Sequence, residues 1–154
     1  MATDKQPDKK GRIMHRCVDI LVLDTKDRIL LLQRTDDDDL FPGKWCLPGG
    51  HINKDEPMYD AAKRELEEET GILAKGLIKV GTYDYENDFV TTLFLCDEKR
   101  GSFVSKNIQL SVKEHQAAKW VPASQFFQQD LAGKLPQLMR ELFFDEYEEE
   151  ENQD

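Results

Sequence analysis

The stretch "CLPGGHINKDEPMYDAAKRELEEETGI" (46–72) carries the densest chemistry of this 154-residue chain. It opens on a Pro-Gly-Gly turn, and its segment "RELEEETG" holds four glutamates inside five residues. Residues 57–69 have the composition of a helix, because Pro57 suits a first turn and Gly71 suits a C-terminal stop. The stretch therefore predicts a turn that leads into an acidic helix.

Three of the clustered glutamates share one face of that helix. Glu65, Glu68 and Glu69 stand at i, i+3 and i+4, whereas Glu67 points elsewhere. One interpretation is a solvated surface helix, because like-charge pairs at this spacing cost only about 0.2–0.5 kcal/mol each. The other is a metal site, because a hard cation such as Mg²⁺ takes a few carboxylates together with substrate phosphates.

The preceding turn favours the metal interpretation. Gly49 and Gly50 let the backbone come close to an ion or a phosphate, because no Cβ intrudes. A metal there would neutralise a diphosphate and activate a water, and a remaining glutamate would take the proton.

The rest of the chain alternates strand-like and helix-like patterns. Two β-branched runs around "DTKD" predict a hairpin over residues 15–34. Ser124 is expected to cap the helix over 123–133, and Gly133 to end it. This order predicts an α/β sandwich around a mixed β-sheet. Further strands are expected over 45–47, 72–85, 89–98 and 118–122, and a final amphipathic helix over 136–147.

Composition and charge limit the location and the partners that we expect for this chain. The last ten residues hold seven acids and no base, so without them the net charge changes from −10 to −3, with 24 acids against 21 bases. We expect a disordered lead over 1–12, a domain over 13–145 and a disordered acidic tail over 146–154. No signal peptide or membrane-spanning run is expected, and three scattered cysteines suggest a reducing, cytoplasmic location. With no basic stripe, nucleic acid is not expected as a partner.

The frame around the glutamates resembles the Nudix box, the signature of the Nudix hydrolases. The segments "WCLPGG" (45–50) and "SVKEHQAAKWVP" (111–122) are also similar to family segments, and the resemblance covers residues 14–145. It implies a Nudix-type α/β/α sandwich and Mg²⁺-dependent water attack on a diphosphate of a nucleotide, with Mn²⁺ as an alternative ion. The matching positions of the box are Gly50, Glu56, Arg64, Glu65, Leu66, Glu68, Glu69, Gly71 and Ile72.

The resemblance also implies roles for single residues. Glu68 and Glu69 would be the main metal ligands, and Gly49 would add its carbonyl oxygen. Glu65 would be a further ligand or the general base.

Two more positions take roles by the same resemblance. Glu114 resembles an outlying acid that reaches the metal from a loop, and it is the alternative general base. Arg64 would orient or neutralise a glutamate, with Glu56 as its structural partner.

Several other side chains have both a pocket and a packing interpretation. A histidine near the box would touch phosphate or simply occupy a turn, and an aromatic side chain would stack on a base or join the core. These residues are His51, His115, Trp45, Trp120, Tyr83, Tyr85 and Phe89.

The box does not identify the substrate. A small single-domain chain of this type resembles the nucleotide-pool-cleaning branch, which would cut a (d)NTP or damaged nucleotide to a monophosphate and pyrophosphate. The alternatives are ADP-ribose, nucleotide sugars, dinucleoside polyphosphates, capped RNA, a nucleotide sensor without activity, and a prenyl diphosphate isomerase that uses Cys46. A small-molecule nucleotide is the expected partner, and a homodimer is left open.

Overall fold

A long strand, β2 (Ile13–Leu23), is the central strand of a mixed sheet. The computed structural model describes residues 2–84, 88–104, 108–111 and 113–143. Within these ranges the other strands are β1 (Lys5–Pro7), β3 (Arg28–Arg34), β4 (Trp45–Cys46), β5 (Gly49–His51), β6 (Ile78–Asp84), β7 (Phe89–Asp97) and β8 (His115–Pro122). The helices are α1 (Met58–Thr70) and α2 (Leu135–Phe143), with 3-10 turns η1 (Glu98–Arg100) and η2 (Ala123–Gln128).

The two long edges of β2 are used differently. One edge pairs in parallel with β7 along its length, and β7 in turn pairs antiparallel with β6. The other edge is shared in succession by β1, β5 and β3, all antiparallel. The predicted hairpin closes only at Leu23 and Ile29, after which β3 leaves β2 to pair with β8 and β4. This divergence makes room for β5 beside the middle of β2.

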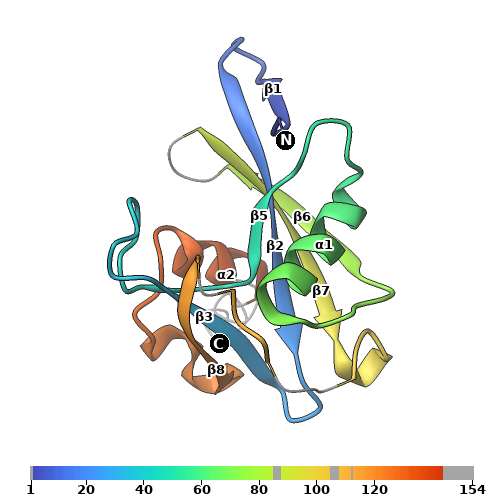
Figure 1. Ribbon diagram of the computed structural model, residues 1–154, viewed down its shortest axis with the longest axis vertical. Coiled ribbons are helices and arrows are strands. Elements are labelled where there is room, and N and C mark those ends of the chain that lie inside the picture. The colour runs from blue at the N-terminus through green and yellow to red at the C-terminus, as the bar shows by residue number, and fades with distance from the viewer. Residues whose placement is uncertain (1, 85–87, 105–107, 112, 144–154) are drawn as a thin grey trace, which may run out of the picture.

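Both faces of the sheet are covered, which confirms the α/β/α sandwich (Figure 1). Alternation along β2 sends Val18, Ile20 and Val22 toward α1 and Leu21 toward the opposite face. The opposite face packs against Phe126 of η2 and Met139 of α2. The site described below therefore lies on a scaffold that is packed from both sides.

Helix α1 forms within one residue of its predicted limits. Pro57 is its N-cap residue, and Gly71 ends it in the left-handed conformation with φ of 77°, its N–H bonded to the Glu67 carbonyl. The buried face of the helix contains Ala61, Ala62, Glu65, Leu66, Glu69 and Thr70. Two of the clustered glutamates thus point into the protein, where burial of charge is costly.

Two predictions differ from the structure. The helix expected over 123–133 is only the short turn η2, and no side chain caps it. The chain leaves it because Trp45 bonds twice to the next segment: its N–H donates to the Asp130 carbonyl, and its carbonyl accepts from the Ala132 N–H. The lead over 1–12 was expected to be disordered, but residues 5–7 add strand β1 to the free edge of β2.

Other expectations are met in part. Residues 72–77 precede strand β6 and are not themselves a strand, and β8 is longer than predicted. The final helix begins at Leu135, while the acidic tail over 146–154 and the residue Tyr85 lie outside the described residues. Within the described ranges, no helix has the length and apolar character needed to cross a membrane.

The turn between β2 and β3 depends on Asp24, which is 3% exposed. Its carboxylate accepts hydrogen bonds from the backbone N–H groups of Lys26 and Arg28 and from Arg28 Nε at 2.6 Å. We predict that Asp24→Ala lowers the free energy of unfolding by about 1–3 kcal/mol, because the N–H groups of the turn lose their shared buried acceptor. Asp24→Asn should cost less, since its amide oxygen can still accept from the turn. Urea denaturation measures both, and equal stability of Asp24→Ala and the wild type would contradict the prediction.

Candidate active site

The clustered glutamates of α1 divide into two environments. Glu65 and Glu69 are 9% and 1% exposed, whereas Glu67 is exposed and the Glu68 side chain is 58% exposed. The predicted shared face of the three glutamates is therefore buried at Glu65 and Glu69 and exposed at Glu68. Burial raises the pKa of Glu65 above its ordinary value and raises that of Glu69 much further.

Glu69 is held by one oxygen and lacks a hydrogen bond at the other. The Gly49 N–H donates to Oε1 at 3.0 Å. Oε2 lies 3.1 Å from Nδ1 of His115, but the contact lacks the geometry of a hydrogen bond, and neither atom has another partner in the described part of the chain. Burial lowers the pKa of His115 to about 4, so its imidazole is neutral and does not form an ion pair.

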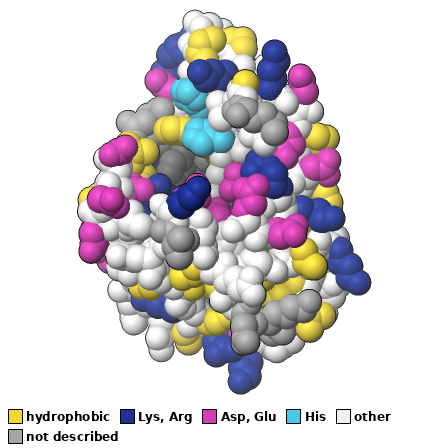
Figure 2. Space-filling view, viewed as in Figure 1, with side chains coloured by type: hydrophobic (Ala, Val, Ile, Leu, Met, Phe, Trp, Pro, Cys, Tyr) yellow, Lys and Arg dark blue, Asp and Glu magenta, His cyan; other side chains and the backbone are white. Residues whose placement is uncertain are grey.

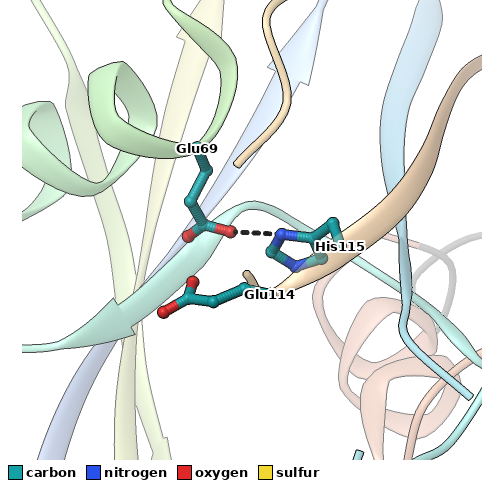
Figure 3. A group of neighbouring side chains, drawn as sticks. All are labelled: Glu69, Glu114 and His115. Carbon is teal, nitrogen blue, oxygen red and sulfur yellow. Dashed lines mark ion pairs between the residues drawn. The ribbon is translucent and has the colours of Figure 1, made fainter. Parts of the chain in front are cut away.

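Glu114 completes a three-residue group with these two side chains (Figure 3). One ligand atom from each of Glu69, Glu114 and His115 lies within 4.8 Å of the other two. Glu69 reaches the group from the end of α1, His115 is the first residue of β8, and Glu114 comes from the turn just before that strand. Glu65 and Glu68 lie outside this group, and their predicted roles as ligands stay predictions.

Arg64 connects the acids on the other side of the helix. Its Nε and Nη2 bind both oxygens of Glu56, at 2.8 and 2.9 Å, and Nη2 also donates to the His51 carbonyl. Its Nη1 lies 2.9 Å from Glu65 Oε1 and 3.2 Å from Glu68 Oε2. One guanidinium thus ties the turn before the helix to two of the clustered carboxylates.

The two glycines of the turn are required by close contacts. A Cβ on Gly49 would lie 2.2 Å from the Val18 carbonyl oxygen and 2.3 Å from Oδ1 of Asp19. A Cβ on Gly50 would lie 2.6 Å from the carboxylate of Glu65. The glycines therefore allow β5 to lie between β2 and the acidic face of α1.

A cavity of about 380 Å³ opens beside this group. Figure 2 shows the hollowed face, with histidine, acidic and basic side chains around the hollow. Polar lining comes from Asp19, Arg34, His51, Lys113 and Glu114, and apolar walls include Leu40, Phe41, Phe89 and Leu135. A diphosphate would meet cations and acids here, and a base would meet apolar walls.

Asp19 and Arg34 line the cavity, and neither was found from the sequence. Asp19 lies on the cavity side of β2, and burial raises its pKa to about 8. The available signal was a single charge in the otherwise apolar segment "VDILVL" (18–23). Arg34, at the end of β3, is held by Asp38 at 2.7 Å, and only the fold reveals that it faces the cavity.

The remaining candidates separate into lining and packing residues. His51 and Phe89 line the cavity. Trp120 stacks on Phe103, and Trp45 and Tyr83 pack against the core between the sheet and α2.

Cys46 also lines the cavity, but burial raises the pKa of its thiol to about 12. The thiolate is therefore suppressed, which weighs against a prenyl isomerase that uses this cysteine.

The donor set fits a divalent cation. A buried carboxylate oxygen with no hydrogen bond, beside a second carboxylate and an imidazole nitrogen, lacks the positive charge that would offset its burial. Glu69, Glu114 and the turn at Gly49 are the described groups best placed to hold such an ion.

Comparison with known proteins identifies the family. Residues 14–143 match the NUDIX domain. The chain belongs to the Nudix family. A 63-residue stretch is 38% identical to an m7GpppN-mRNA hydrolase (NUDT17) of Xenopus laevis, covering 41% of this chain and 21% of that protein. The chain spans between about a fifth and a half of the length of the first curated relatives that it matches.

Solved Nudix structures share the fold over most of the chain. The MutT protein of Methanosarcina mazei Go1 superposes with a TM-score of 0.66 at 28% identity, covering 92% of this chain and 96% of that one. The NUDIX domain of Shewanella oneidensis NrtR, solved with ADP ribose, has a TM-score of 0.70 at 24% identity, covering 88% and 90%. The fold of this Nudix chain is thus shared with both proteins over most of its length.

The pairing of Arg64 with Glu56 predicts a pH dependence of stability. Arg64 lowers the pKa of Glu56 below its ordinary 4.5, so the pair stabilises the fold above that pH and the gain is lost as the pH falls through the lowered pKa. Glu56→Gln should cost about 1–2 kcal/mol at pH 7 and less at pH 3. Urea unfolding at the two pH values measures this, with the exposed Glu67→Gln as control. A loss that is equal at both pH values would count against the ion pair.

Proposed function

We propose that this Nudix chain is a divalent-metal-dependent pyrophosphohydrolase that cleaves a diphosphate linkage in a nucleoside diphosphate derivative. The observation that carries the proposal is the buried Glu69 oxygen without a hydrogen bond, which faces Glu114 and His115 at the edge of the cavity. A bound divalent cation would neutralise the diphosphate and lower the pKa of a water.

Different residues around the cation site would bind the metal and the substrate. Glu69 and Glu114, with Glu68 at the rim and the Gly49 carbonyl, would hold Mg²⁺ or Mn²⁺. Arg34 and Lys113, which line the cavity, would bind phosphate oxygens of the substrate.

Glu65 is the favoured general base. Its carboxylate faces Gly50, and burial raises its pKa above the ordinary value, which makes it a stronger proton acceptor. Arg64 holds its Oε1 and so fixes its position. Glu114 is the alternative base, because it is exposed and lies close to Glu69.

For the substrate, the size and walls of the cavity support a (d)NTP or damaged nucleotide. A cavity of about 380 Å³ can hold one nucleoside, with Leu40, Phe41 and Phe89 as apolar walls for a base. The products would be a nucleoside monophosphate and pyrophosphate. The similarity to an mRNA hydrolase makes a capped RNA the second candidate, although the mildly acidic body of the chain has no basic stripe for it.

The role of Glu69 is tested by Glu69→Gln. We expect kcat to fall by about 100-fold or more, because the amide cannot supply an anionic ligand. Release of monophosphate from a nucleotide in the presence of Mg²⁺ measures it, and Glu67→Gln on the exposed side of the same helix should retain full activity. Full turnover in Glu69→Gln would refute the proposed site.

The substrate class is tested by a product analysis. The purified chain is incubated with Mg²⁺ or Mn²⁺ and dNTPs, oxidised dGTP, ADP-ribose, nucleotide sugars, dinucleoside polyphosphates and a capped RNA. We expect the highest kcat/KM for a dNTP or an oxidised dNTP. A clear preference for another class would replace the substrate while keeping the chemistry, and binding without turnover across the panel would indicate a sensor.

A further inference from the structure

His115 is a buried histidine, 5% exposed, whose two ring nitrogens face different elements. Nε2 lies 3.8 Å from Sγ of Cys46 in β4, and Nδ1 lies 3.1 Å from Oε2 of Glu69 at the end of α1. The imidazole therefore lies between a thiol on one side and a carboxylate on the other. Its proton can stay on only one nitrogen while the ring is neutral.

The surroundings of Cys46 offer an acceptor for a proton on Nε2 of His115. The Cys46 thiol donates its hydrogen to the Leu32 carbonyl at 3.5 Å, so the sulfur has lone pairs left to accept. It can accept the Nε2–H of His115. Nδ1 then keeps its lone pair and points toward the acids. A metal-bound histidine has the same arrangement, because one ring nitrogen binds the ion while the N–H of the other donates a hydrogen bond.

With Glu69 ionised, two bare acceptors face each other in the interior. Nδ1 of His115 and Oε2 of Glu69 are both buried, and neither has a hydrogen bond within the described ranges of the chain. A lone pair opposite a carboxylate oxygen at 3.1 Å is unfavourable until a cation or a proton lies between them. Glu114 offers a third oxygen to the same point (Figure 3).

The separation of the two atoms suits two ligands of one ion. Ligands bound at about 2.1 Å and at right angles to each other are about 3.0 Å apart. The observed 3.1 Å matches that spacing. The missing hydrogen-bond geometry also agrees with it, because two ligands point toward a shared ion and not toward each other.

We propose that His115 Nδ1 is a ligand in a mixed nitrogen–oxygen metal site with Glu69 and Glu114, which favours a divalent transition ion over Mg²⁺. An imidazole nitrogen suits first-row transition ions, whereas Mg²⁺ prefers oxygen ligands. The inference rests on the metal site of the proposed function and specifies which ion that site selects.

The direct test is electron spin echo envelope modulation on the protein loaded with Mn²⁺, which detects a nitrogen bound to the ion. We expect modulation from ¹⁴N in the wild type, and its change after selective ¹⁵N-histidine labelling. The chain has three histidines, at positions 15, 51 and 115. His115→Gln should abolish the signal, and the matched control His15→Gln should keep it. If His115→Gln does not fold, persistence of the signal in both His15→Gln and His51→Gln assigns it to His115.

Calorimetric titration of the metals separates a ligand from a positioning residue. If His115 binds the ion, His115→Gln should weaken Mn²⁺ binding by about tenfold or more and change Mg²⁺ binding much less. An equal loss for both ions would overturn the proposal, because it would mean that His115 only positions Glu69. Bound Mn²⁺ without histidine coupling would overturn it and leave the proposed function intact, whereas no binding of either ion would overturn both.

Discussion

The burial of two carboxylates on the inner face of α1 is the constraint on which the site depends. Glu65 and Glu69 are among the few buried charged groups of the described chain, and each needs compensation. Glu65 receives it from Arg64, and one oxygen of Glu69 receives it from the Gly49 N–H. The other oxygen of Glu69 receives none. The helix is thus stabilised by its own apolar residues Ala61, Ala62 and Leu66, while one buried Glu69 oxygen stays without a hydrogen bond in the described part of the chain.

The sheet places the partners of these carboxylates. Because β3 leaves β2 after a single pair of residues, β5 can join the middle of β2 and bring Gly49 and Gly50 under the helix. A side chain at either glycine would collide with β2 or with Glu65. The same register places Asp19 directly opposite Gly49. The close backbone contact at Gly49 and the Asp19 carboxylate therefore lie at the same point of the sheet. Strand pairing is what requires glycine at this position.

The chemistry of the site is less uniform than a cluster of glutamates suggests. On one side, Arg64 and Glu56 form a fully paired network that joins the turn to the helix. On the other side, His115 and Cys46 add nitrogen and sulfur atoms next to the acids. A paired network can hold position without a ligand, whereas facing acceptors cannot be satisfied without a cation or a proton. The first half is suited to orienting residues, and the second half to binding.

The sequence by itself determined the family, the α/β/α class and the acidic helix, because these depend on local patterns: the spacing in the box, the cap at Pro57 and the stop at Gly71. It also singled out Glu114 and His115 as a pair. It did not separate Glu68, which lies at the rim, from Glu65 and Glu69, because the width of the buried face depends on what packs against the helix. It missed Asp19 and Arg34, which are ordinary strand residues until β7, β5 and α2 enclose the cavity. It extended the helix beyond Gln128, because the backbone bonds that Trp45 makes with Asp130 and Ala132 come from a strand more than 80 residues earlier in the chain. The facing of His115 and Glu69 was decided by tertiary structure alone, since it requires α1, β4 and β8 to meet and no local pattern encodes that meeting.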